Sequence, residues 1–275
     1  MTTKRIVLLG AGNVAHHLAP ALLNAGMNLC QIYSRSIESA RELGKKTGIS
    51  YTADLFAVYP DCDIYIFCVS DDALLSLFKG LRINKNALVL HTSGSLPLSI
   101  FESYVENYGV LYPLQTFSRK RVLNFSEVPL CIEASNENSR IVLRAIAERL
   151  SGQVKEISSE KRERLHLAAV FANNFTNHLY GIAGKMLEEE GLDFSLLRPL
   201  IFETAHKVML LSPEEAQTGP ARRNDESILG RHKALLKGDR KLSTLYSLLS
   251  DSIKETLEKN EPKSVVEDQL TLTLW

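Results

Sequence analysis

The sequence predicts an α/β fold, in which a doubly wound, mostly parallel sheet at residues 1–157 is followed by an all-α domain at residues 158–275. In the first part, apolar runs of strand length alternate with helix-like segments, a pattern typical of a parallel sheet covered on both faces. From residue 159 to residue 259 we find only helical periodicity. No Gly- or Ser-rich linker marks the change, so we expect two domains that pack directly.

The elements follow in a regular order. Strands are predicted where short apolar runs are bounded by polar or glycine residues, at 4–10, 29–35, 62–70, 86–94, 108–115, 127–134 and 152–158. Helices are predicted where apolar side chains recur every three to four residues, at 13–26, 36–48, 71–80 and 138–150. Residues 160–191 are predicted to form one long helix, and further helices follow with breaks at 211–213 and 219–220. The end of the chain, 260–275, is interpreted as an extended tail on an apolar surface, for example that of a second subunit.

Composition excludes several classes of function. The 32 basic residues equal the 32 acidic ones, so a net charge of zero gives no electrostatic reason to expect nucleic acid or an anionic membrane as a partner. No apolar stretch approaches the roughly 18 residues that a membrane span needs. The four cysteines form no CxxC pair, so we expect reduced thiols in a cytoplasmic protein and no metal site.

A glycine-rich motif, G-x-G-x-x-A, occurs at Gly10, Gly12 and Ala15, between the first predicted strand and the first helix. Gly10 permits a tight turn, Gly12 lets backbone amides approach a pyrophosphate, and Ala15 lets the helix pack on the strand. We therefore expect a dinucleotide to contact Gly10, Gly12, Asn13 and Val14 at the helix N-terminus. The alternative is a turn that uses its glycines for geometry only.

The end of the second strand indicates which dinucleotide binds. Sites that prefer NAD place an acid there for the ribose 2′-hydroxyl, whereas this chain has Ser34 and Arg35. Because a guanidinium suits a 2′-phosphate, we expect NADP(H) rather than NAD(H). The alternative is a surface arginine near a helix start.

Two more strand ends are expected to border the same crevice, because ligands of open α/β sheets lie beyond the carboxyl ends of the strands. Val69 and Ser70 follow one strand, and His91, Thr92 and Ser93 follow the next. We assign Val69, Ser70, His91 and Thr92 to the cofactor, and Ser93 to orientation of the reacting group. His91 could instead cap its strand.

Two features of the helical half are candidates for substrate contact. On α-helical periodicity Asn173 shares a face with His166 and Asn177. Its amide either pairs with a neighbouring helix, or binds substrate or the nicotinamide carboxamide in the interdomain cleft. Arg223 lies in the break "QTGPARRND" and either binds a substrate carboxylate or a cofactor phosphate, or belongs to a charged turn, where one arginine pairs with Asp225 or Glu226. Arg222 is expected on the surface.

The motifs "GAGNVAHHLA", "SR", "CVSD", "HTSGS", "YPLQTFS" and "TGPARRND" with His232 resemble, in this order, a two-domain family named as NADP oxidoreductases. Its members join a Rossmann-type domain to a C-terminal helical domain of unknown function. The resemblance runs from about residue 6 to about residue 249. Where the family typically has glycine in "TGP-x-x-R-x-D", this chain has Asn224.

The wider superfamily includes pyrroline-5-carboxylate reductase, the 6-phosphogluconate and β-hydroxyacid dehydrogenases and the deazaflavin-dependent NADP reductases. This resemblance implies NADPH in the first domain, a second domain like the C-terminal domain of 6-phosphogluconate dehydrogenase, and a homodimer formed through it. The lysine that β-hydroxyacid dehydrogenases place one turn before an asparagine is absent, since Ala169 and Val170 stand one turn before Asn173 and Asn174. An imine-type or otherwise different reduction therefore fits the resemblance better than a lysine-based mechanism.

Two functions follow from these observations. The first is an NADP(H)-dependent oxidoreductase (EC class 1) that acts on a small anionic substrate in the interdomain cleft, with Ser93, Asn173 and Arg223 orienting the substrate. The second is a non-catalytic regulator that binds NADP(H). A positioned proton donor would distinguish them, and His91, Tyr112 and His166 are the candidates that remain open.

Overall fold

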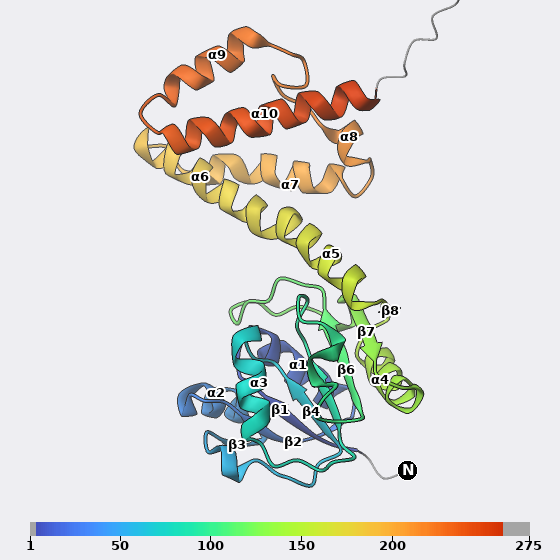
Figure 1. Ribbon diagram of the computed structural model, residues 1–275. Coiled ribbons are helices and arrows are strands. Elements are labelled where there is room, and N and C mark those ends of the chain that lie inside the picture. The colour runs from blue at the N-terminus through green and yellow to red at the C-terminus, as the bar shows by residue number, and fades with distance from the viewer. Residues whose placement is uncertain (1–3, 261–275) are drawn as a thin grey trace, which may run out of the picture. The chain divides into compact units, whose positions relative to one another are not determined.

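The computed structural model describes residues 4–260, with side chains up to residue 256 (Figure 1). Eight strands form one sheet: β1 (Arg5–Leu9), β2 (Asn28–Tyr33), β3 (Ser50–Thr52), β4 (Ile64–Phe67), β5 (Leu88–His91), β6 (Tyr108–Pro113), β7 (Leu130–Ala134) and β8 (Val154–Glu156). Their order is β3-β2-β1-β4-β5-β6-β7-β8. Every neighbouring pair is parallel except β6 and β7. The predicted mostly parallel sheet is thus confirmed, and β3 is a short edge strand that the sequence pattern did not reveal.

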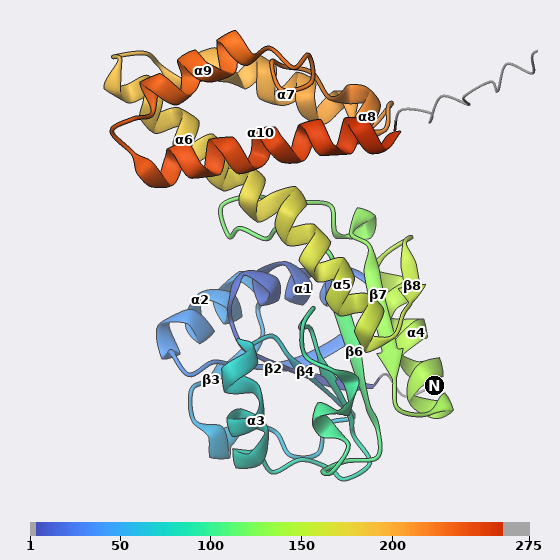
Figure 2. The same cartoon turned by 45° about the horizontal axis from the view of Figure 1, so that its top comes forward.

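The order of the strands places a crevice at one edge of the sheet. The chain runs from β1 to β2 on one side, and β4 then pairs with β1 on the other. Such a reversal opens a crevice at the carboxyl ends of the strands, between the loops that follow β1 and β4. The tilted view in Figure 2 shows β2 and β4 among the helices α1, α2 and α3.

The side chains of each central strand alternate between two apolar cores. Ile6 and Leu8 of β1 belong to the core that α1 and α4 cover, whereas Val7 and Leu9 belong to the core on the side of α3. All four are buried, as are all residues of β4. Burial on both faces explains why these strands read as continuous apolar runs rather than as alternating ones.

Helices and short helical turns connect the strands and form the C-terminal part. The described helices are α1 (Asn13–Asn24), α2 (Ile37–Thr47), α3 (Asp71–Gly80), α4 (Glu137–Leu150), α5 (Ser159–Ala169), α6 (Thr176–Glu189), α7 (Arg198–Lys207), α8 (Pro213–Ala216), α9 (Glu226–Leu235) and α10 (Arg240–Asn260). The 3-10 turns are η1 (Leu55–Ala57), η2 (Leu98–Phe101), η3 (Phe125–Glu127) and η5 (Phe194–Leu197), and η4 (Val170–Phe175) is a π-helix. No helix in the described part of the chain is long and apolar enough to cross a membrane.

The predicted long helix is continuous from Ser159 to Glu189, but the π-helical segment η4 interrupts its α-helical hydrogen bonding. The hydroxyl of Thr176 donates to the carbonyl oxygen of Phe171, five residues earlier, at 3.1 Å. Because a π turn contains more residues than an α turn, the helix face before η4 is rotated relative to the face after it. The common face expected for His166, Asn173 and Asn177 assumed unbroken α-helical periodicity, which η4 interrupts.

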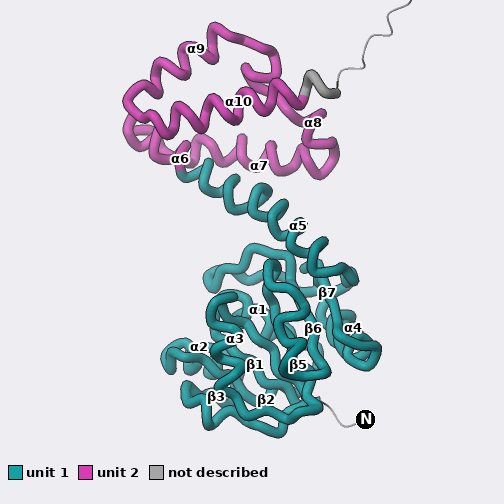
Figure 3. Tube along the Cα trace, in the orientation of Figure 1, with its two compact units in different colours: residues 1–181 teal, residues 182–275 magenta. Residues whose placement is uncertain are grey.

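By contact density the chain forms two compact units, residues 1–181 and 182–275 (Figure 3). The first contains the sheet with its helices, α5 and η4, and the second contains α7 to α10 with the end of α6. The domain boundary predicted at 157/158 stays a prediction. The two compact units meet at 181/182, so α5 belongs to the first unit. The tail predicted at 260–275 lies outside the described residues, apart from the last residue of α10.

Candidate functional site

The glycine-rich turn between β1 and α1 has a backbone that only glycine fits at its first position. Gly10 has a φ of +113°, and a Cβ there would lie 2.2 Å from the carbonyl oxygen of Cys68. The amide of Gly10 donates to the carbonyl oxygen of Tyr33 at 2.7 Å, which ties the turn to β2. The turn therefore passes directly against the start of the loop after β4, where a side chain would block it.

The N-terminus of α1 is open to a ligand. Gly12 is its N-cap residue, with extended backbone, and a Cβ there would meet only the carbonyl oxygen of Cys68, at 4.0 Å. Within the described residues no side chain caps this helix, and its first turn contains no acid. The amides at the helix start, which include those of Asn13 and Val14, have no partner within an α-helix and carry partial positive charge. This arrangement suits the pyrophosphate of a dinucleotide.

The residues that follow β2 include no acid at the position where NAD-preferring sites bind the ribose 2′-hydroxyl, as the sequence predicted. Ser34 is half-buried, and its amide donates to the carbonyl oxygen of Thr52 at 3.1 Å. Arg35 is exposed, and the nearest following acid, Glu38, accepts a hydrogen bond from the hydroxyl of Ser36 at 2.9 Å. Arg35 is thus the charged group that β2 presents at the carboxyl edge, where a 2′-phosphate requires a cation.

The loops after β4 and β5 lie at the same edge. Val69 is half-buried and Ser70 is exposed at the N-cap of α3, without a side-chain capping bond. The hydroxyl of Thr92 donates to the carbonyl oxygen of Phe67 at 3.1 Å. Ser93 is half-buried, and its Oγ accepts from the amides of two following residues, Ser95 at 3.1 Å and Leu96 at 3.0 Å, so it holds the turn after β5.

His91 has a fully buried side chain that faces the apolar core. Its Nδ1 accepts from the amide of Ser93 at 3.2 Å, and its ring lies 6.0 Å from that of Phe101. Burial, reinforced by the positive charge of Arg162, lowers the pKa of His91 to about 3, so the imidazole is neutral. The cofactor contact assigned to His91 remains a prediction, and with a buried ring only the backbone of His91 is available for it.

The predicted cofactor residues are thus brought together, because they follow four neighbouring parallel strands at one edge. Ser93 lies in the same group. Asn173 is exposed in η4, within a π-helical turn of the kind that often occurs at functional sites. Arg223 is exposed in the second unit, and both assignments remain predictions.

The segment that contains Arg223 forms a tight turn before α9. Asn224 has a φ of +52°, a left-handed conformation that glycine adopts easily and asparagine tolerates, which explains how asparagine serves where the family has glycine. Arg222 donates to the carbonyl oxygen of Glu214 at 2.7 Å. Asp225 caps α9, accepting from the amide of Ile228 at 3.1 Å, and Glu226 pairs with Lys254. Among the described residues, neither arginine pairs with Asp225 or Glu226.

A contact that sequence reasoning missed joins the loop after β6 to the glycine-rich turn. Arg119 donates to the carbonyl oxygen of Ala11 at 2.7 Å and to the carboxylate of Glu42 at 2.9 Å. Nε2 of His17 lies 3.0 Å from the carbonyl oxygen of Ser118, which holds the same loop on α1. The basic run at 119–121 was a visible signal, but nothing in the sequence placed it near residue 11.

Two of the open candidates for a proton donor lie together. The hydroxyl of Tyr112 is 3.1 Å from Nδ1 of His166, and the two rings meet edge to face with centroids 6.0 Å apart. Both rings touch Gly94, which follows Ser93 in the turn after β5.

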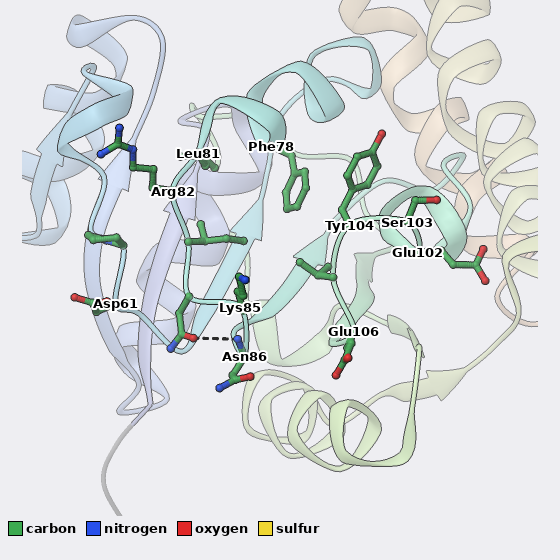
Figure 4. A pocket seen from close by; sticks show the side chains of 14 residues that line it. Asp61, Phe78, Leu81, Arg82, Lys85, Asn86, Glu102, Ser103, Tyr104 and Glu106 are labelled. Carbon is green, nitrogen blue, oxygen red and sulfur yellow. Dashed lines mark hydrogen bonds between the residues drawn. The ribbon is translucent and has the colours of Figure 1, made fainter.

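The described cavities lie elsewhere in the first unit. One, of about 890 Å³, is lined by residues that precede β4 and β5 and by residues 102–106, with the rings of Phe78 and Tyr104 on its wall (Figure 4). It is therefore at the amino ends of the strands, opposite the glycine-rich turn. A second, of about 280 Å³, lies between α1 and the loop after β6. Neither contains any predicted site residue.

Comparison with known proteins gives the class of the two halves. Residues 5–93 match the family "NADP oxidoreductase coenzyme F420-dependent", and residues 128–253 match the "Domain of unknown function (DUF2520)". A search of curated proteins gives no match.

Solved structures extend the likeness over almost the whole chain. "Putative NADP oxidoreductase BF3122" from Bacteroides fragilis is 47% identical with a TM-score of 0.88, covering 92% of this chain and 98% of that chain. A reductive aminase from Aspergillus terreus, in complex with NADPH and ethyl levulinate, is 15% identical with a TM-score of 0.68 and covers 94% and 95%. A 1-pyrroline-5-carboxylate reductase from Streptococcus pyogenes is 13% identical with a TM-score of 0.60 and covers 92% and 98%. The last two likenesses show the fold alone.

The fold and the open glycine-rich turn define a dinucleotide-binding protein of the Rossmann type. The chain belongs to the family of NADP oxidoreductases with a DUF2520 domain, and the resemblance drawn from its motifs is confirmed. NADP(H) as the cofactor is likewise confirmed, and the uncapped start of α1 and the exposed Arg35 after β2 fit it.

Proposed function

We propose that this protein is an NADP(H)-dependent oxidoreductase of EC class 1, and that it acts on a small anionic substrate in a cleft between its two domains. One observation supports the proposed cofactor site. The uncapped N-terminus of α1 and Arg35 follow the adjacent parallel strands β1 and β2, so both lie at the carboxyl edge of the sheet. The helix start holds the pyrophosphate, and Arg35 holds the 2′-phosphate. When bound, NADPH supplies the hydride, and the protein supplies orientation and electrostatics.

Binding measurements on Arg35→Ala test this part of the proposal. A hydrogen bond to a charged group contributes roughly 1.5–3 kcal/mol, so NADPH affinity falls about 10- to 100-fold. NADH affinity stays within about twofold, since NADH lacks the 2′-phosphate. Arg82→Ala is the matched control, because Arg82 lines the cavity at the opposite edge of the sheet. Equal affinity of the unaltered protein for NADPH and NADH would refute the assignment of Arg35.

The substrate part of the proposal rests on Arg223, Ser93 and Asn173. Arg222 is engaged by a backbone carbonyl, whereas the exposed guanidinium of Arg223 has no hydrogen-bond partner among the described residues. We assign Arg223 to a substrate carboxylate. A panel of carboxylate-bearing ketones and imines, followed by NADPH absorbance, tests this assignment. With an accepted substrate, Arg223→Ala raises KM at least tenfold and Arg222→Ala leaves it unchanged. NADPH that binds but is never oxidised would favour the regulator instead.

We also propose a homodimer formed through the second unit. Its described residues include only three that are buried, Ala221, Leu229 and Ser250. Its large apolar side chains are mostly exposed, among them Leu196, Leu200, Phe202, Met209, Leu210, Leu211, Leu235 and Leu248. Exposed apolar area on this scale marks an interaction surface, because a helical layer must bury its apolar stripe against another element. A second copy of the chain provides that element.

The expected cytoplasmic location stays part of this proposal. All four cysteines are free, and three of them, Cys62, Cys68 and Cys131, are buried. Reduced thiols are the normal state in a reducing compartment.

A further inference from the structure

The start of α5 is fixed to the turn after β5 by hydrogen bonds between distant segments. Oγ of Ser159 accepts from the amide of Leu98 at 2.8 Å. Arg162, whose side chain is buried, donates to the carbonyl oxygen of Leu96 at 2.5 Å and to the carboxylate of Glu133 at 2.6 Å. α5 is thus held in one position relative to the carboxyl ends of β5 and β7, as its course beside β7 in Figures 1 and 2 indicates.

One turn after Arg162, this anchoring places His166 against the turn after β5. Nδ1 of His166 is 3.1 Å from the hydroxyl of Tyr112, near the end of β6. A Cβ on Gly94 would lie 2.8 Å from Cγ and Nδ1 of His166 and 2.9 Å from Cζ of Tyr112. The two rings therefore lie directly on the backbone of the turn that contains Thr92 and Ser93.

The surroundings of the pair suit a proton-transfer role. Tyr112 is buried, and burial first, then Cys131, raises its pKa, so it stays a neutral phenol. Arg162 on α5, whose charge acts on Tyr112, is paired with Glu133 on β7 in an ion pair at 2.6 Å. His166 itself is only half-buried, whereas His91, the other histidine at this edge, is enclosed and neutral. Of these two histidines His166 is the more exposed, and its Nε2 has no hydrogen-bond partner among the described residues.

We propose that His166 is the catalytic acid and base of the oxidoreductase reaction, and that Tyr112 is its positioning residue. This inference rests on the proposed function. With NADPH bound, the cofactor supplies a hydride to the carbon of a C=O or C=N bond. The π electron pair of that bond moves to the heteroatom, which takes the proton from Nε2 of protonated His166. A C–H and an O–H or N–H bond form, and neutral His166 regains its proton from water.

Tyr112 determines which nitrogen of His166 carries the moving proton. The hydroxyl of Tyr112 lies within hydrogen-bond distance of Nδ1, and in the proposed arrangement its phenol oxygen accepts from Nδ1–H, so that Nε2 gains and loses the proton. This is the role that a third group has towards the base of a catalytic triad, with a neutral phenol in place of a carboxylate.

Histidine NMR on the full-length protein tests the inference without knowledge of the substrate. ¹³C- and ¹⁵N-labelled histidines are recorded at fixed pH, and the His166 signals are assigned with His166→Gln. Two probes are compared, NADP⁺ and adenosine 2′,5′-bisphosphate, which lacks the nicotinamide half. We expect NADP⁺ to shift the His166 Cε1–H resonance and the bisphosphate to leave it in place.

The role of Tyr112 has its own spectroscopic readout. Tyr112→Phe keeps the ring and removes the hydroxyl, so the nitrogen shifts of His166 move from the Nδ1–H tautomer towards the average of both tautomers. Tyr246→Phe is the matched control, because Nδ1 of His232 lies 2.8 Å from the hydroxyl of Tyr246 in the second unit. It must change His232 and leave His166 unaltered. Thermal melting confirms that each variant is folded.

The possible outcomes separate the two proposals. If neither probe binds, the proposed function fails. If both bind and the His166 signals do not respond to NADP⁺, His166 lies away from the nicotinamide and the inference is overturned. If Tyr112→Phe leaves the His166 tautomer unchanged, Tyr112 is not its positioning residue.

Discussion

Arg119 donates a hydrogen bond to the carbonyl oxygen of Ala11 at 2.7 Å, although the two residues are 108 positions apart in the chain. The same guanidinium pairs with Glu42 on α2 at 2.9 Å. A loop that leaves β6 therefore braces the glycine-rich turn from outside and connects it to the helix that follows β2. This contact restricts the movement of the turn to which we assign the cofactor pyrophosphate.

Arg119→Ala is expected to weaken NADPH binding about fivefold, since one such hydrogen bond contributes about 1 kcal/mol to the position of the turn. Isothermal titration calorimetry measures the change. Lys120→Ala is the control, because it removes the same charge from the same loop, and Lys120 is exposed. If both variants lose affinity equally, the effect is that of charge alone and the brace contributes nothing.

Gly10→Ala is expected to destabilise the protein even without cofactor. The positive φ and the 2.2 Å approach to the carbonyl oxygen of Cys68 require the backbone to move. We expect a loss of roughly 2–4 kcal/mol, which lowers Tm by about 5–15 °C in a chain of this size. Gly230→Ala in α9 is the control, since its Cβ meets nothing within 4 Å. A melting curve of Gly10→Ala that overlays the unaltered one would contradict this prediction.

The buried imidazole of His91 is expected to make stability depend on pH. Its pKa is about 3 in the folded protein and 6.5 when unperturbed, so between these values the unfolded chain binds the additional proton. The stabilisation is complete above pH 6.5 and is lost as the pH falls towards 3, by up to about 5 kcal/mol.

His91→Asn tests the pH dependence. Asparagine can accept the hydrogen bond from the amide of Ser93, two residues on, but does not titrate. Urea unfolding at a series of pH values should show a shallower loss of stability below pH 6.5 in the variant. Parallel curves for the two proteins would show that His91 is not responsible.

Phe202→Glu combined with Leu210→Glu is expected to convert the dimer to a monomer. Both side chains are more than two-thirds exposed, at 71% and 73%, and a charge at each prevents apolar faces from meeting. Analytical ultracentrifugation measures the association state. Val122→Glu is the control, because Val122 is 99% exposed but lies in the first unit. An unaltered protein that sediments as a monomer at micromolar concentration would rule out the proposed homodimer.

Local sequence patterns predicted the parts of the fold that depend on local physics. A strand buried on both faces must be apolar throughout, and the positive φ at Gly10 requires glycine. Both features can therefore be recognised from the local sequence. The glycine-rich turn and the absence of an acid after β2 could likewise be predicted, because each depends on only a few neighbouring residues. The family resemblance rested on these motifs, and the comparisons confirmed it.

Other features were beyond such patterns. The edge strand β3 has only three residues, too few to show a period. The π-helical turn at Val170–Phe175 depends on hydrogen bonds that a helical sequence does not specify. The common face expected for His166 and Asn173 assumed unbroken α-helical periodicity, which this turn interrupts.

By itself the sequence determined the sheet, the glycine-rich turn and the choice of NADP(H), because each is encoded by the period, size or charge of neighbouring residues. Only the tertiary structure decided that Arg119 reaches Ala11, that His91 is enclosed, and that Tyr112 meets His166. The last pair is 54 residues apart and is joined only because β6 and α5 both pack beside Gly94. Contacts of this kind arise when distant segments pack together, and such packing produces no periodic pattern of residues in the sequence.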